Sequence, residues 1–151
     1  MRSTSILGLN LLKKFEGLRL NAYLCAANVA TIGYGSTRYL NGKAVKIGDK
    51  LESEQEASAL LLNTLTIYEN AVNKHLTNLN QCQFDALVCF CYNVGVGAFT
   101  KSTLLKKAKL NAADPSILDE FMKWNRGGGK VLQGLVNRRR DEAKLYFSLC
   151  N

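Results

Sequence analysis

The sequence of 151 residues has a single proline, a single histidine and a single tryptophan, and its acidic residues are fewer than its basic ones, 12 against 20. The scarcity of proline argues against long disordered linkers, and 47% hydrophobic residues are typical of a globular chain. The longest apolar run, Ala86–Tyr92, has seven residues, whereas a membrane-spanning helix needs about 18. We therefore expect one globular domain over residues 1–151 and no stable membrane insertion.

The N-terminus lacks the pattern of a secretory signal peptide. Its apolar stretch is broken by Gly8 and Asn10, it runs into Lys13 and Lys14, and no small-x-small cleavage site follows. We expect no signal peptide and synthesis in a cytoplasm.

Cysteine and histidine are too few or wrongly spaced for a metal site. The five cysteines are an odd number and cannot all pair within one chain, and cytosolic thiols stay reduced, so we expect free thiols. Cys89 and Cys91 do not have the spacing of a zinc site, and His75 is the single histidine. We expect neither a metal nor another cofactor.

The excess of lysine and arginine gives a net charge of +8. Such a charge favours a polyanionic partner, which is a nucleic acid, an anionic membrane surface or a negatively charged cell wall. Charge alone does not choose among these partners, and a basic surface without a special partner is the fourth interpretation.

The first fifty residues predict one helix followed by a small sheet. Apolar residues recur at helical spacing over residues 5–15, and Gly17 marks the end of that helix. Three short alternating segments follow, at residues 20–24, 30–34 and 43–47, with the turn dipeptide Asn41-Gly42 before the last of them. These segments predict an antiparallel sheet of three strands.

The remaining chain predicts helices. Ser53 and Glu56 have the spacing of a capping box and open a long helix that ends at His75. Further helices are expected over residues 81–92, from Ser102, from Asp114 and over residues 133–149, with glycine-containing breaks at 93–97 and 127–129. The fold class is α+β, with a sheet lobe over about 18–50, a helical lobe over about 53–151, and a substrate cleft between the lobes.

A catalytic motif lies across the first helix and the sheet. Glu16 is followed after eight residues by Cys25, and Cys25 after five residues by Thr31. This spacing resembles the Glu, Asp or Cys, and Thr pattern of the phage-type lysozymes, the endolysins of glycoside hydrolase family 24. Later segments resemble that family in the same order: 83–87, 92–95, 99–104, Trp124 with 128–130, and 134–140. The resemblance covers nearly the whole chain.

This resemblance implies hydrolysis of the β-1,4 bond between N-acetylmuramic acid and N-acetylglucosamine in bacterial peptidoglycan. Breaking a glycosidic bond needs a protonated carboxylic acid at the leaving oxygen and a second group that stabilises the sugar cation or activates water. Glu16 is the only acidic residue before Asp49, so we expect it to be the general acid. Burial in the cleft wall is expected to keep its proton in place.

Cys25 stands where many members of the family have aspartate. A free thiol is only a few per cent ionised at pH 7, so alone it is a weaker base or nucleophile than a carboxylate. Three interpretations stay open: a thiolate favoured by Arg19 and Arg38, a group that positions water together with Thr31, or an ordinary small residue of a strand.

The other predicted site residues follow from the resemblance. The hydroxyl of Thr31 can hold a water at the far face of the sugar, although a β-branched residue on a strand is its ordinary interpretation. Thr37, Tyr92 and Ser102 correspond to positions that bind saccharide, while Tyr92 and Trp124 would equally suit a core. Ser36 stands where the family often has histidine.

The resemblance also implies the biological setting. We expect a monomer that acts in lysis of a bacterial host, moves from the host cytoplasm to the periplasm and cell wall, and reaches peptidoglycan through a holin pore. Arg138, Arg139 and Arg140 are expected on a positive face or on an ordinary solvated surface.

Two other functions remain possible from the sequence. One is a lytic transglycosylase that uses Glu16 alone. The other is a non-enzymatic basic module that binds nucleic acid, for which the chain has no recognisable motif.

Overall fold

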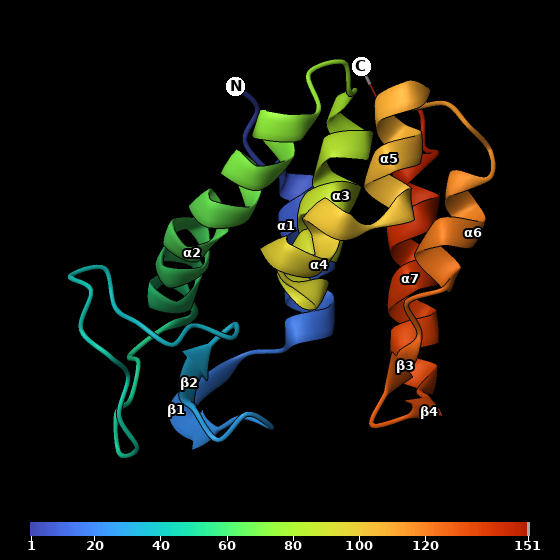
Figure 1. The fold of residues 1–151 in the computed structure, drawn as a ribbon. Helices are drawn as coiled ribbons and strands as arrows, with labels where there is room; N and C mark the ends of the chain where they lie inside the picture. Colours follow the sequence, from blue (N-terminus) through green and yellow to red (C-terminus); the bar gives the residue numbers. More distant parts are fainter. Residues whose placement is uncertain (151) are drawn as a thin grey trace. The chain divides into compact units, whose positions relative to one another are not determined.

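The computed structural model describes residues 1–150, which form mostly helix with two small antiparallel sheets (Figure 1). The order of elements is α1 (Ile6–Glu16), β1 (Arg19–Leu24), β2 (Ala30–Gly33), α2 (Glu54–His75), α3 (Gln81–Val94), α4 (Val96–Lys101), α5 (Thr103–Leu110), α6 (Ile117–Met122), β3 (Arg126–Gly127), β4 (Lys130–Val131) and α7 (Gln133–Tyr146). The predicted α+β fold class is confirmed.

The chain divides into two compact units. Residues Lys13–Ile67 form one, called here the sheet unit, and Met1–Leu12 together with the chain from Tyr68 onward form the other, called the helical unit. None of the helices formed by residues 1–150 is long and apolar enough to cross a membrane.

The sheet unit is built on the antiparallel pair β1 and β2. Tyr23 lies opposite Thr31, and a register shift interrupts the pairing between Arg19 and Tyr23. Gly17 separates α1 from this sheet: its φ of +71° is a conformation that glycine adopts without strain, and its N–H bonds to the carbonyl of Lys13.

The predicted third strand is wrong. The turn at Asn41 and Gly42 forms, but residues 43–47 contribute a single bridge, between Ala44 and Arg38, and no continuous strand. Of the apolar side chains in that segment only Val45 is buried. One buried side chain gives too little apolar contact to hold a strand on a small sheet.

The long helix α2 runs over the predicted residues and begins with half of the predicted capping box. The amide of Glu56 donates to the hydroxyl of Ser53, as expected, but the Glu56 carboxylate accepts from the amide of Glu52 instead of that of Ser53. The first bond satisfies an amide that the first helical turn leaves without a partner, and the second fixes the residue before the N-cap.

The core of the helical unit is α3, which is buried on nearly every side from Cys82 to Cys91. A capping box of Asn80 and Gln83 opens it, and α7 packs along it, with α6 beside α7 (Figure 1). The N-terminal segment is attached to the same helix, because the amide of Ser5 donates to the buried carboxylate of Asp85 at 3.0 Å.

Several predicted boundaries differ from the structure, and the helix expected from Asp114 begins at Ile117. The expected turn over residues 93–97 is a single residue, Gly95, between α3 and α4. The last helix ends at Tyr146 instead of Leu149. The glycine run at 127–129 is the tight turn of the β3–β4 hairpin, where Gly128 and Gly129 both have positive φ.

The expectation that all five cysteines are free is wrong for two of them. Cys82, at the start of α3, and Cys150, after α7, form a disulfide with their Cα atoms 5.5 Å apart. An odd number of cysteines does not prevent one pair from forming, and the remaining three are free. Helix α7 packs along α3, so the chain that follows α7 returns to the start of α3. The separation of 68 residues hides this proximity in the sequence.

We expect reduction of the Cys82–Cys150 disulfide to lower the free energy of unfolding by about 4 kcal/mol, because the bond closes a long loop in the unfolded chain. Urea unfolding with and without dithiothreitol measures this difference. Cys82→Ser is the control, in which the reductant should have no effect; identical curves for the wild-type protein in both buffers would contradict the expectation.

Candidate active site

The three predicted catalytic residues lie within the sheet unit, on consecutive elements. Glu16 is the last residue of α1 and is half-exposed, Cys25 directly follows β1, and Thr31 lies on β2. Lys13 and Lys14 occupy the same last turn of α1 as Glu16.

A tight hairpin loop brings Cys25 close to Thr31. The amide of Cys25 donates to the carbonyl of Val29 at 3.0 Å, and the amide of Asn28 donates to the carbonyl of Cys25 at 2.8 Å. Asn28 has a φ of 61°, a left-handed conformation that asparagine tolerates better than most residues. The loop therefore fixes the backbone of Cys25 from both sides.

Local hydrogen bonds favour the anionic form of Cys25. Bonds from the backbone of Val29, then from the side chain of Thr31, then from the backbone of Ala27, lower the pKa of the Cys25 thiol. Arg19 and Arg38 are not among these groups: the Arg19 guanidinium lies 4.3 Å from the centre of the Tyr23 ring, and Arg38 donates to the carbonyl of Gly42.

Thr31 connects the thiol to the hairpin. Its side chain is buried, and its hydroxyl donates to the carbonyl of Val29 at 2.9 Å. A hydroxyl has one hydrogen and two lone pairs. It can therefore accept a hydrogen bond from the neutral thiol in this position, and by rotating it donates to the thiolate.

The carboxylate of Glu54 joins three segments around this hairpin. Its Oε1 atom accepts from Lys13 in α1 at 3.0 Å, from Tyr34 after β2 at 3.0 Å and from Ser58 in α2 at 2.5 Å. These three donors, with Ser58 first, lower the pKa of Glu54 to about 2. The end of α1, the end of β2 and the start of α2 are thus fixed to one another.

The predicted saccharide contacts are distributed over both units. Thr37 is exposed in the sheet unit. In the helical unit Tyr92 is half-buried with its ring 5.0 Å from that of Tyr68, and Ser102 is the buried N-cap of α5, whose hydroxyl donates to Phe99 and accepts from Leu105. The substrate contacts assigned to these three residues stay predictions.

Ser36, where the family often has histidine, is fully buried. Its backbone pairs with that of Ile32 through two hydrogen bonds. It belongs to the interior of the sheet unit.

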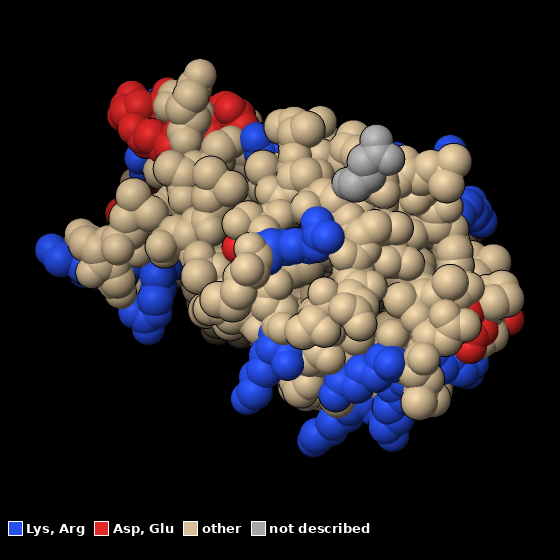
Figure 2. All heavy atoms as spheres, turned by 90° about the horizontal axis from the view of Figure 1, so that it is seen from above, with Lys and Arg blue, Asp and Glu red and all other residues tan. Residues whose placement is uncertain are grey.

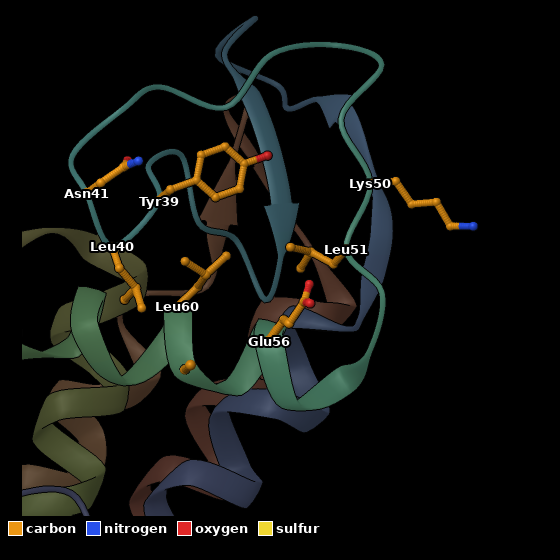
Figure 3. Close-up of a pocket in the computed structure, with 8 residues that line it drawn as sticks. Tyr39, Leu40, Asn41, Lys50, Leu51, Glu56 and Leu60 are labelled. Atoms are coloured by element: carbon orange, nitrogen blue, oxygen red, sulfur yellow. The ribbon is translucent and has the colours of Figure 1, made fainter.

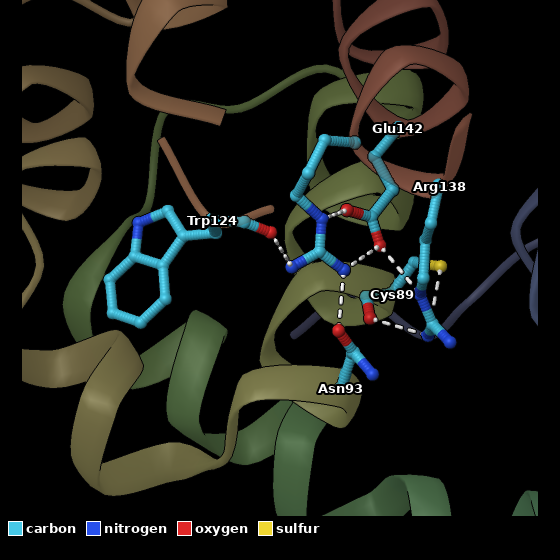
Figure 4. Close-up of polar contacts among 6 residues, drawn as sticks. Cys89, Asn93, Trp124, Arg138 and Glu142 are labelled. Carbon is cyan, nitrogen blue, oxygen red and sulfur yellow. Dashed lines mark hydrogen bonds and ion pairs between the residues drawn. The ribbon is translucent and has the colours of Figure 1, made fainter. Parts of the chain in front are cut away.

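The arginine run of α7 was placed wrongly by the sequence. Arg138 and Arg139 are buried around the carboxylate of Glu142, with nitrogen to oxygen distances of 3.1 and 2.7 Å (Figure 4). Only Arg140 is exposed. The signal that was available is the spacing, since an acid three and four residues after two arginines lies on their face of a helix.

This buried cluster reaches two other parts of the helical unit, α3 and the segment after α6. Arg138 donates to the carbonyl of Cys89, and Arg139 to the side chain of Asn93 at 2.7 Å and to the carbonyl of Trp124 at 3.5 Å (Figure 4). Desolvation raises the pKa of Glu142, and the two arginines oppose this effect. The cluster belongs to the interior of the helical unit, and Trp124 beside it is half-buried, with its ring packed edge-on against Phe90.

A separate pocket of about 550 Å³ lies in the sheet unit (Figure 3). Its lining residues are Tyr39, Leu40, Asn41, Lys50, Leu51, Glu56, Ala59 and Leu60. The Lys50 side chain points away from the other labelled side chains (Figure 3). The pocket includes none of the predicted catalytic residues.

The described residues offer no obvious metal site. Within residues 1–150, no three side chains of histidine, cysteine, aspartate or glutamate gather in an arrangement that would hold a metal ion.

Comparison with known proteins finds one family along most of the chain. Residues 13–142 match the family model described as phage lysozyme. The endolysin of Bacillus phage B103 is 43% identical over 145 residues, which cover 93% of this chain and 52% of that protein. The chain thus spans about half the length of this relative.

Two solved structures have the same fold over the whole chain. An endolysin from Escherichia coli O157:H7 phage FAHEc1 has a TM-score of 0.88 and 36% identity, covering 99% of this chain and 97% of that one. The muramidase domain of SpmX from Asticaccaulis excentricus has a TM-score of 0.83 and 31% identity, covering 99% of this chain and 100% of that one.

We expect Cys25 to be the one thiol that iodoacetamide alkylates in the folded protein, because Cys89 and Cys91 are buried and the other two cysteines are paired. Thiolates react and thiols do not. A lowered pKa therefore shifts the alkylation profile to lower pH than that of free cysteine. Thr31→Val removes a donor to the thiolate and should move the midpoint to higher pH.

The alkylation rate as a function of pH, followed by mass spectrometry, measures this midpoint. Cys25→Ser is the control and should stay unlabelled in the native state. An unchanged midpoint in Thr31→Val would contradict the role of the hydroxyl.

Proposed function

Since the chain belongs to the phage lysozyme family, as its sequence motif predicted, we propose that it hydrolyses the β-1,4 bond between N-acetylmuramic acid and N-acetylglucosamine in bacterial peptidoglycan. The predicted enzyme class, a glycoside hydrolase of the lysozyme type, is confirmed at the level of the family. The bond that is cleaved and the residues that cleave it form the proposal.

The observation that carries the proposal is the contact of Cys25 with Thr31 at one hairpin, at the family's spacing from Glu16 and inside the matched residues. In this proposal Glu16 donates a proton to the bridging oxygen as the bond to the leaving sugar breaks. Its half-exposed position at the end of α1 is compatible with access to substrate.

Cys25 and Thr31 act on the other side of the reacting sugar carbon. A Cys25 thiolate stabilises the positive charge that develops on the sugar ring, and the Thr31 hydroxyl positions the water that completes hydrolysis. The hydrogen bonds that lower the pKa of the thiol support the ionised form of Cys25. No metal or other cofactor takes part.

The surface charge supports an anionic polymer as the substrate. Blue lysine and arginine side chains are widely distributed over the face drawn in Figure 2, and acidic side chains gather at fewer places. With a net charge of +8, the protein attracts the carboxylates of cell-wall peptides over several ångströms in a salt-dependent way. We further propose that the protein acts as a monomer and reaches the wall from the host cytoplasm through a holin pore.

We expect Glu16→Gln to lower the rate of peptidoglycan hydrolysis roughly 10²- to 10⁴-fold, because an amide has no proton to donate to the leaving oxygen. The decrease in turbidity of bacteria stripped of their outer membrane measures this rate. Glu52→Gln, at an exposed loop residue, makes the same change of charge and should retain activity. Wild-type activity in Glu16→Gln would refute the assignment.

Mass spectrometry of the products tests the type of reaction. Hydrolysis gives reducing ends, whereas 1,6-anhydromuramic ends would identify a lytic transglycosylase and overturn the proposed hydrolysis.

We expect Cys25→Asp to retain activity and Cys25→Ala to lose most of it, since a carboxylate replaces the negative charge of the thiolate and a methyl group does not. The same turbidity assay, with circular dichroism to establish that each variant folds, compares the two. Equal activity in Cys25→Ala and the wild-type protein would remove Cys25 from the mechanism.

A further inference from the structure

An apolar groove of about 410 Å³ lies on the helical unit between α6 and α7. Its lining residues are Pro115, Leu118, Arg140, Ala143, Lys144 and Phe147. The two helices lie side by side in Figure 1, and α6 contacts α7. None of the lining residues is part of the proposed catalytic site.

The groove uses a face of α7 that only partly overlaps the face packed in the core. Arg140, Ala143, Lys144 and Phe147 follow at intervals of three, one and three residues, which places them on one side of a helix. The side chains of Leu118 and Phe147 remain 46% and 42% exposed. Half-exposed apolar side chains that face one groove are a surface that favours an apolar occupant.

Two positive charges at the groove are not neutralised within the protein. Arg140 and Lys144 are exposed and form no ion pair with any of residues 1–150. The buried acid of α6, Glu120, is already engaged, since it pairs with Lys107 and Lys123. No lining residue is acidic, so the groove combines apolar walls with a positive edge.

Two further apolar side chains of the helical unit are exposed. Leu149 is fully exposed and Leu110 is 88% exposed. Two bonds hold their segments in place: the hydroxyl of Tyr146 donates to the carbonyl of Ala112 at 2.7 Å, and the disulfide fixes Cys150 next to Leu149. Apolar side chains therefore project from backbone that is anchored to the core.

We propose that this groove binds an anionic phospholipid at a membrane surface, with an acyl chain along Leu118 and Phe147 and the phosphate between Arg140 and Lys144. Apolar walls with a positive edge complement an acyl chain next to an anionic headgroup. A stable protein interface needs about 20 to 30 residues on each side, and a groove with six lining residues is better matched to a single chain of lipid. The contact is peripheral and independent of the catalytic assignment.

Sedimentation with lipid vesicles tests the charge requirement. The wild-type protein should bind vesicles of phosphatidylcholine mixed with phosphatidylglycerol, and should not bind vesicles of phosphatidylcholine alone. Arg140→Glu combined with Lys144→Glu should weaken this binding by about tenfold or more. The control, Arg126→Glu with Lys130→Glu, changes two exposed residues of the β3–β4 hairpin and the net charge equally, and should bind nearly as the wild-type protein does.

The apolar requirement needs a second pair of variants. Leu118→Ser with Phe147→Ser should weaken vesicle binding, and Phe147→Leu, which retains an apolar side chain, should not. Thermal unfolding by circular dichroism establishes that each variant folds. Hydrolysis of purified peptidoglycan without lipid, measured at a salt concentration that screens the net charge, should be unchanged in all of them, which separates this proposal from the catalytic one.

Several results would overturn the lipid site. They are equal binding to both kinds of vesicle, an equal loss in the two charge variants, wild-type binding by the double serine variant, and absence of wild-type binding to either vesicle. An equal loss in the charge variants would indicate general attraction by the net charge. Absence of binding would leave the groove to an acidic apolar peptide.

Discussion

The helical unit depends on one buried carboxylate. Glu142 has no exposed surface, and its two oxygens are held by Arg138 and Arg139, both almost fully buried. Removing ions from water is costly, and close partners of opposite charge together with further hydrogen bonds offset that cost. The arginines supply these bonds by reaching the backbone of Cys89 and Trp124. Charge compensation therefore fixes α7 against α3 and sets the position of the chain before the β3–β4 hairpin.

The segments of the sheet unit, which has a small core, are held together by a carboxylate that is not fully buried. The carboxylate of Glu54 remains partly exposed and gathers three donors from three segments. The hairpin that carries Cys25 and Thr31 is held mainly by bonds between close neighbours in sequence. Such short-range bonds allow a reactive side chain to be positioned precisely without burying it.

Local sequence patterns predicted most of the helices, because capping residues and helical periodicity are properties of neighbouring residues. The spacing of Glu16, Cys25 and Thr31 is equally local, and it pointed to the family. They did not predict contacts between distant segments. The Cys82–Cys150 bond joins residues 68 positions apart, and the burial of Arg138 and Arg139 depends on what α7 packs against. The predicted third strand was wrong because the prediction rested on the alternation of residues 43–47 alone, without a surface against which their side chains could pack.

The exposure of Cys25 has a chemical consequence that an aspartate at this position would avoid. It is the single free cysteine of residues 1–150 that is not buried, and its environment favours the form that peroxides attack. Oxidation to a sulfenic acid would place a bulkier, differently charged group beside Thr31. If Cys25 has the catalytic role proposed for it, oxidants would inactivate the protein reversibly at this residue, while Cys89 and Cys91 are buried in the core.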